Sequence, residues 1–192
     1  MSLIRIFQKH GVKLFVIISL ISGIAYLFAA DAKYQGYAPD QPIPFSHKIH
    51  AGELKISCQY CHSGVEVSAH ATVPDQGTCM KCHSVVASDS PNIQYLRQTY
   101  KQGVPIRWVK VHDLPDHVRF SHRPHIARGF DCNQCHGDDT RGLKVEEMDK
   151  IQVTTKFNMG WCIKCHRDNA VQEHPPGNNH DVKITECSTC HY

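Results

Sequence analysis

Residues 45–62 read FSHKIHAGELKISCQYCH, and residues 120–136 read FSHRPHIARGFDCNQCH. Both stretches begin with Phe-Ser-His-x-x-His and end with Cys-x-x-Cys-His, and the first cysteine follows the first histidine by 11 residues in one and by ten in the other. Each stretch is followed by one more Cys-x-x-Cys-His motif. The chain therefore contains a repeated two-motif unit, over about 45–83 and about 120–166.

The cysteines of the 192-residue chain all fall in such motifs. A fifth motif at 187–191 completes the set, so the ten cysteines form five pairs and none remains for a disulfide. In a helical turn, two cysteines three residues apart can bond both vinyl groups on one porphyrin edge, while the adjacent histidine reaches the iron. The pattern predicts five covalently bound haem c groups. The predicted thioether cysteines are Cys58, Cys61, Cys79, Cys82, Cys132, Cys135, Cys162, Cys165, Cys187 and Cys190. The predicted proximal ligands of the iron are His62, His83, His136, His166 and His191.

Zinc is the main alternative for Cys-x-x-Cys pairs. Zinc sites of this kind combine two pairs, which would leave one of the five unused, and zinc gives no reason for a histidine after every second cysteine. A thioredoxin-like site would need a βαβ pattern around a pair, and the sequence has none. Because much of the apolar content lies in the first 30 residues, we expect the porphyrins to fill the core of the remaining chain.

Each iron of an electron-transfer haem also needs a sixth ligand, usually histidine or methionine. The Phe-x-His-x-x-His lead-in of each repeat resembles that of the small class III multihaem cytochromes. The resemblance implies that the first histidine, His47 or His122, binds the haem of the motif just downstream. The second histidine, His50 or His125, then reaches a different haem.

The sixth ligand of the fifth haem is harder to identify. Our first choice is His112, which lies shortly before the second repeat in Val-His-Asp-Leu-Pro-Asp-His. A methionine in its place would raise the potential of that haem. The alternatives are His70, His117, His174, His180, Met148 and Met159.

The N-terminus carries an uncharged stretch at 14–30, LFVIISLISGIAYLFAA. As a helix it would span roughly 25 Å, close to a bilayer core of about 30 Å. Three basic residues and no acid precede it, which predicts a cytoplasmic N-terminus and a haem domain on the periplasmic side. We expect residues 1–30 to be a single-pass anchor in the cytoplasmic (inner) membrane. The alternative is a signal peptide cleaved near 30–32.

The rest of the chain is balanced in charge. Of 21 basic residues, three lie in 1–30, which leaves 18 against 18 acidic residues and no basic run. Nucleic-acid binding therefore has no support in the sequence, and we expect no nucleic-acid partner. Residues 31–44, which contain three prolines, read as a linker, and 45–192 as the pentahaem domain. The predicted fold is mostly α-helical and irregular, class III cytochrome-like, wrapped around five haems, with one transmembrane helix.

Between the repeats, the spacing of Ile93, Leu96 and Tyr100 predicts a short helix that ends near Gly103. Residues 106–111 alternate in polarity, which favours a short strand or an extended segment.

Four longer runs resemble one family. They are PIPFSHKIHAGELKISCQYCHSGVE, CMKCH, IRWVKVHDLPDHVRFSH and MGWCIKCHR. Together with the apolar N-terminus and the five motifs, they resemble the pentahaem cytochrome subunits of alternative complex III, a bacterial quinol:electron-acceptor oxidoreductase. The resemblance implies an electron relay without quinol chemistry of its own. Its donor would be an iron–sulfur subunit or quinol site beside membrane subunits, and its acceptor a monohaem cytochrome or a terminal oxidase.

Two other functions remain open. A quinol dehydrogenase feeding a periplasmic reductase shares the anchor and several haems, but a methionine typically follows its first motif, where this chain has Ser63-Gly64. A stand-alone periplasmic carrier would require cleavage of the N-terminal segment. Bis-histidine ligation predicts mostly low potentials, which suit a menaquinol-like donor.

Overall fold

The computed structural model describes residues 3–192 except 33–34, 139–141 and 171–184. The chain divides into two compact units, Met1–Tyr37 and Ala38–Tyr192. The smaller unit is built on one helix, α1 (Leu3–Ala32), whose described apolar side chains, such as Phe15 at 71 % exposed, face outward. In the part of the chain that the structure describes, no helix is both long and apolar enough to cross a membrane.

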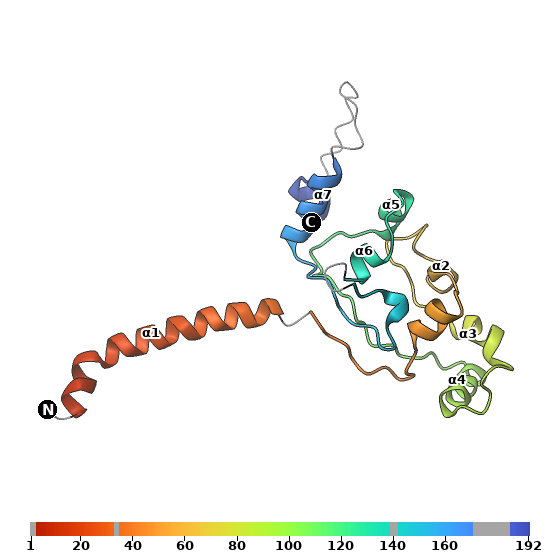
Figure 1. The fold of residues 1–192 in the computed structure, drawn as a ribbon, viewed down its shortest axis with the longest axis horizontal. Coiled ribbons are helices and arrows are strands. Elements are labelled where there is room, and N and C mark those ends of the chain that lie inside the picture. The colour runs from red at the N-terminus through yellow and green to blue at the C-terminus, as the bar shows by residue number, and fades with distance from the viewer. Residues whose placement is uncertain (1–2, 33–34, 139–141, 171–184) are drawn as a thin grey trace, which may run out of the picture. The chain divides into compact units, whose positions relative to one another are not determined.

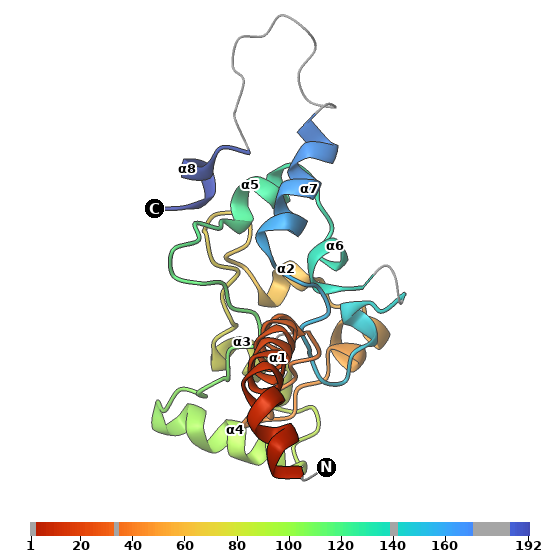
Figure 2. The same ribbon diagram turned by 90° about the vertical axis from the view of Figure 1, so that its left-hand side faces the viewer.

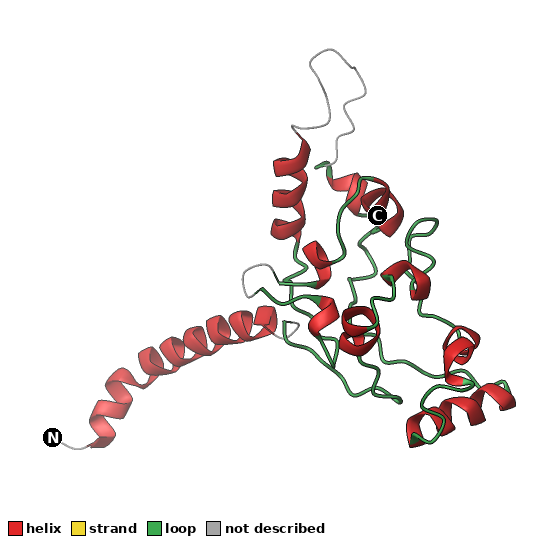
Figure 3. Ribbon diagram, turned by 45° about the vertical axis from the view of Figure 1, so that its right-hand side comes forward, coloured by secondary structure: helices red, strands yellow, loops and turns green. Residues whose placement is uncertain are grey.

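The larger unit consists of short helices joined by loops, and its described residues contain no strand (Figure 3). Two isolated bridges, Val118 with His191 and Asp138 with Leu143, are its only β-type pairings outside the grey segments. The elements are η1 (Lys48–Glu53), α2 (Cys58–Cys61), α3 (Gln76–His83), α4 (Pro91–Gln102), α5 (His122–Ala127), α6 (Asn133–His136), η2 (Val145–Glu147), α7 (Met159–Ala170) and α8 (Cys187–Cys190).

Each of the five motifs forms a helical turn, in α2, α3, α6, α7 and α8. The α3 turn begins at Asp75, whose carboxylate accepts a 2.7 Å hydrogen bond from the Thr78 amide. The helix predicted around Leu96 is confirmed as α4, and Gly103 ends it in the left-handed conformation with φ of 65°. Residues 106–111 form no strand, because they pair with a side chain instead of a neighbouring strand: Gln41 bonds both the N–H and the carbonyl of Val109.

The helices of the larger unit are spread between its two ends. In both Figure 1 and Figure 2, α3 and α4 lie at one end and α7 and α8 at the other with α5 beside them, and α2 and α6 lie between the two ends. Residues 38–44 of the predicted linker belong to this unit, where Asp40 pairs with Lys150 at 2.7 Å and Ile43 is buried.

The packed protein core is thin. The buried apolar side chains among the described residues are Ile43, Val65, Leu96, Met148 and Val153. One close backbone contact joins η1 to η2: Lys48 N–H donates to the Met148 carbonyl at 2.9 Å, and a Cβ on Gly52 would collide with the Glu146 carbonyl. A unit of this size with so few buried side chains needs a further apolar filling to be stable.

Candidate haem-binding sites

Each motif histidine faces a second histidine from another part of the chain. We number the pairs by motif, so that site 1 contains His62 and site 5 contains His191. The ring centres are 6.5 Å apart for His47 and His62 (site 1), 6.1 Å for His50 and His83 (site 2), 6.3 Å for His122 and His136 (site 3), 6.1 Å for His125 and His166 (site 4), and 5.5 Å for His117 and His191 (site 5).

These gaps fit an iron held between two imidazoles. A metal–nitrogen bond is about 2 Å long, and a ring centre lies about 1 Å behind its nitrogen, so two imidazoles on opposite sides of one metal have centres roughly 6 Å apart. Rings in direct van der Waals contact stack more closely, as Phe45 does on His50 at 4.3 Å. The rings of sites 1 and 3 are also nearly parallel, at 3° and 10°. The residues present therefore suit a bis-histidine haem at each motif.

Backbone carbonyls fix the orientation of most of these rings. A carbonyl oxygen can only accept, so the Nδ1 that meets it carries the proton, and Nε2 is left with a lone pair for a metal. The Nδ1 acceptors are the carbonyls of Thr72 for His62 at 2.7 Å, Val86 for His83 at 3.0 Å, Ser46 for His50 at 2.8 Å, Ala69 for His122 at 2.9 Å, Ser121 for His125 at 2.7 Å and His117 for His191 at 3.3 Å.

Thr72 is a functional backbone position that the sequence did not reveal. It has φ of 65°, a conformation that costs a β-branched residue free energy, and its carbonyl accepts from the proximal His62. Gly64 lies across the same loop, where a Cβ would meet the His70 carbonyl at 2.6 Å. Gly64 thus allows the close packing of this loop.

Burial keeps several of the imidazoles neutral. Burial is the first cause that lowers the pKa of His136 to about 3, followed by the neighbouring His112 and His122. Burial, and then His62, lowers the pKa of His47 to about 4, and the Nδ1 of His47 is buried without a hydrogen-bond partner. An imidazole must be neutral to bind a metal, so these environments favour ligation.

The motif cysteines lie next to the histidine pairs and form no disulfides. All ten are free thiols. Burial, and then neighbouring thiols, raise the pKa of Cys132 and of Cys135 to about 11, so both are protonated at neutral pH. The thiols that contribute most to these shifts come from other motifs, Cys58 for Cys132 and Cys165 for Cys135.

The structure brings His117, and not His112, opposite His191. The ring of His112 lies edge-on against His136, with centres 4.5 Å apart and planes at 86°, which leaves no room for a metal between them. His117 is placed by backbone pairing at the C-terminal motif, because Arg119 N–H donates to the Cys190 carbonyl at 2.7 Å. This contact spans the sequence from 119 to 190, so local spacing carries no signal for it.

The other candidates for the last ligand lie elsewhere. Met148 is buried and its carbonyl accepts from η1, whereas Met159 is 65 % exposed. His70 is exposed on the loop after motif 1. His174 and His180 lie outside the described residues.

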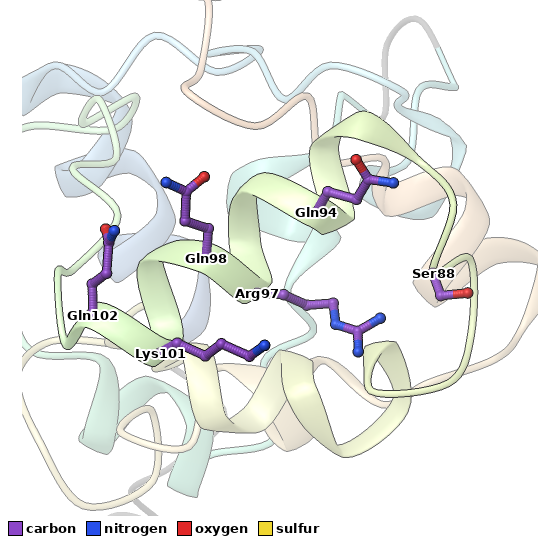
Figure 4. Close-up of a pocket in the computed structure, with 6 residues that line it drawn as sticks. All are labelled: Ser88, Gln94, Arg97, Gln98, Lys101 and Gln102. Atoms are coloured by element: carbon purple, nitrogen blue, oxygen red, sulfur yellow. The ribbon is translucent and has the colours of Figure 1, made fainter.

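A shallow hollow lies away from the histidine pairs, on the polar face of α4 (Figure 4). Its lining consists of Ser88, Gln94, Arg97, Gln98, Lys101 and Gln102. These side chains lack the apolar surface that a porphyrin needs.

Two comparisons with known proteins agree with this geometry. Residues 118–192 match the family model described as cytochrome c7 and related cytochrome c. Over 162 residues the chain is 31 % identical to a protein of Nitratidesulfovibrio vulgaris strain Hildenborough named menaquinone reductase, multiheme cytochrome c subunit. The match covers 79 % of this chain and 68 % of that relative.

Proposed function

We propose that this chain, which belongs to the multihaem cytochrome c family, relays electrons between the quinone-reactive part of a respiratory complex and a second redox partner. Membership in the family implies covalently bound haem c. The observation that carries the proposal is the set of five histidine pairs, each beside a Cys-x-x-Cys turn. A bound haem supplies one-electron redox chemistry, and two histidines per iron leave no open position for a substrate.

The protein's own task is to hold and orient the cofactors. The predicted cysteines would form the thioether bonds, and the facing histidines would bind the irons, with His117 as the second ligand of site 5. Backbone carbonyls hold the rings through Nδ1, which makes the imidazoles better donors to the metal. Phe45 and Phe120 each pack between the two histidines of one lead-in. The proposed count is five haems for one chain.

In the direction of electron flow that the resemblance to alternative complex III implies, quinol would be the electron donor. The chain would receive them from an iron–sulfur or membrane subunit of a complex like alternative complex III and pass them to a monohaem cytochrome or a terminal oxidase. Low-potential bis-histidine haems suit a menaquinol donor. The relay would take part in the complex's reaction without binding quinol itself.

The opposite direction is the second candidate, and one specific observation favours it. The relative that covers 79 % of the chain is named a menaquinone reductase subunit. In this version, the chain would accept electrons from a soluble donor and deliver them toward menaquinone. Both versions use the same sites, so only the direction of flow separates them.

We also propose that α1 anchors the chain in the cytoplasmic membrane, with the haem domain on the periplasmic side. The segment 14–30 is uncharged, and its side chains from Leu14 to Ile24 are largely exposed. An exposed apolar helix surface of this length needs a lipid or protein partner. Sequencing the mature N-terminus tests the anchor, since a start near residue 31 would contradict it.

The decisive experiment is purification of the native protein in mild detergent. We expect it to carry five haems and to co-purify with iron–sulfur and polytopic membrane subunits. Reduction of its haems by a menaquinol analogue, and reoxidation by a cytochrome, would support the first direction. Reoxidation of the reduced complex by menaquinone would support the second. A lone soluble cytochrome that exchanges electrons with neither quinol nor quinone would contradict both.

A further inference from the structure

We infer that the haem-binding sites do not follow the order of their motifs along the chain. The contacts place site 1 between site 2 and site 3, so that the sites run 2–1–3–4–5. This inference rests on the proposed function, because it takes each histidine pair to hold a haem. It identifies site 2 and site 5 as the two ends of the array.

Sites 2 and 1 are neighbours through one lead-in. The ring of Phe45 lies between their second histidines, 4.3 Å from His50 and 5.0 Å from His47. The motif helices also touch, since the Lys81 ammonium of α3 lies 5.4 Å from the centre of the Tyr60 ring in α2.

Sites 1 and 3 are joined although their lead-ins begin 75 positions apart, at residues 45 and 120. The loop after motif 1 is bonded to α5, since Arg123 N–H donates to the Ser68 carbonyl at 3.3 Å. The loop after motif 1 also holds the second ligand of site 3: the Ala69 carbonyl accepts from His122 both at the backbone N–H, at 3.1 Å, and at Nδ1, at 2.9 Å.

Sites 3, 4 and 5 continue in the order of the sequence. Phe120 lies 4.9 Å from both His122 and His125, which repeats the role of Phe45. Phe157 bridges onward, 6.2 Å from His136 and 5.6 Å from Trp161 of α7.

Backbone contacts extend this order to the C-terminus. Arg119 N–H donates to the Cys190 carbonyl at 2.7 Å, and the adjacent Phe120 ring lies 4.9 Å from His125 of site 4. The helices α7 and α8, which carry motifs 4 and 5, lie at the same end of the larger unit in Figures 1 and 2. Site 4 is therefore the neighbour of site 5.

The helices at the two ends agree with this order. Site 2 is backed by α4, whose Thr99 accepts a 2.7 Å hydrogen bond from Gln76 of α3. Site 5 is formed by α8, and α3 and α8 lie at opposite ends of the larger unit in Figures 1 and 2. A partner that exchanges electrons at the α4 end would thus be closest to the haem of site 2, and not to that of site 1.

Two matched variants of the full chain test the order. Cys79→Ser with Cys82→Ser removes the thioether bonds of site 2, and Cys58→Ser with Cys61→Ser removes those of site 1. Adjacent haems shift each other's midpoint potentials by Coulomb interaction, which weakens with distance. In a potentiometric titration, we expect the loss of site 2 to shift one of the four remaining midpoints, and the loss of site 1 to shift two. The reverse pattern would overturn the order.

The haem count separates this inference from the proposed function. A parent protein with fewer than five haems by mass spectrometry would overturn both, whereas five haems with the reversed titration pattern would overturn the order alone. If either variant fails to fold, anomalous diffraction at the iron edge from the unaltered protein gives the answer. The iron bound by His47 and His62 should have those of sites 2 and 3 as its two nearest neighbours. A site 2 iron nearer to site 3 than to site 1 would contradict the inference.

Discussion

The imidazoles of His117 and His191 lie 5.5 Å apart with their planes 20° from parallel, at the point where the chain's last turn meets residues 117–119. This relationship supports His117 as the proposed second ligand of site 5. We expect His117→Ala to convert one of the five haems from low spin to high spin, because its iron loses its sixth ligand. Optical and EPR spectra of the ferric protein measure the change.

His112→Ala is the matched control for this ligand. His112 lies edge-on to His136 and faces no motif histidine across a metal-sized gap. We expect all five haems of this variant to stay low spin. A high-spin haem in His112→Ala, with none in His117→Ala, would show that His112 is the ligand.

A substitution at Gly52 tests whether the close contact between η1 and η2 stabilises the fold. A Cβ at this position would collide with the Glu146 backbone carbonyl, which cannot move as a side-chain end could. We expect Gly52→Ala to lower the free energy of unfolding by about 1–3 kcal/mol. Urea unfolding followed by far-UV circular dichroism measures it.

Gly160 provides the comparison for the same substitution. A Cβ there meets only the Asn158 side chain at 3.5 Å, within α7. We expect Gly160→Ala to raise the free energy of unfolding by about 0.5–1 kcal/mol, because alanine loses less backbone entropy in a helix. Equal effects of the two variants would exclude a steric role for Gly52.

The sequence predicted much of this structure, because a haem-attachment motif is formed by residues that are close together in the chain. The Cys-x-x-Cys-His turns and α4 follow from spacing within about a dozen residues. The pairing of His117 with His191 depends instead on backbone bonds such as Arg119 to Cys190, which no spacing encodes. The same applies to Thr72, whose carbonyl matters more than its side chain. The non-sequential order of sites likewise arises from loops that pack on distant helices.

Asp75 links the stability of α3 to pH. Its carboxylate caps the helix through the Thr78 amide and hydroxyl, and these hydrogen bonds hold the pKa of Asp75 below its ordinary value of 3.8. The cap therefore stabilises the folded state fully when the pH is above the ordinary pKa of an aspartate, 3.8. This stabilisation is lost as the pH falls through the lower pKa that Asp75 has in the folded state. Asp75→Ala should lower the thermal midpoint at pH 7, and the deficit relative to the parent should shrink in strong acid.

Asp75→Asn serves as the control for this cap. Asparagine accepts the same amide hydrogen bond but does not titrate. Its thermal midpoint should stay closer to that of the parent at pH 7 than Asp75→Ala does. An Asp75→Ala deficit that is independent of pH would argue that packing, and not the charged cap, is responsible.

The angle between facing rings distinguishes site 2 from sites 1 and 3. The planes of His50 and His83 cross at 60°, whereas those of His47 and His62 are 3° apart. Two iron d orbitals can interact with the π systems of the axial imidazoles. Parallel imidazole planes would both interact with the same one of these orbitals and would separate the two orbital energies strongly. Crossed planes would interact with both orbitals and would separate their energies weakly. Ferric EPR should therefore show rhombic low-spin signals from sites 1 and 3 and a signal of much higher anisotropy from site 2. His50→Met should remove that anisotropic signal and leave the rhombic ones, and its persistence would assign it to another haem.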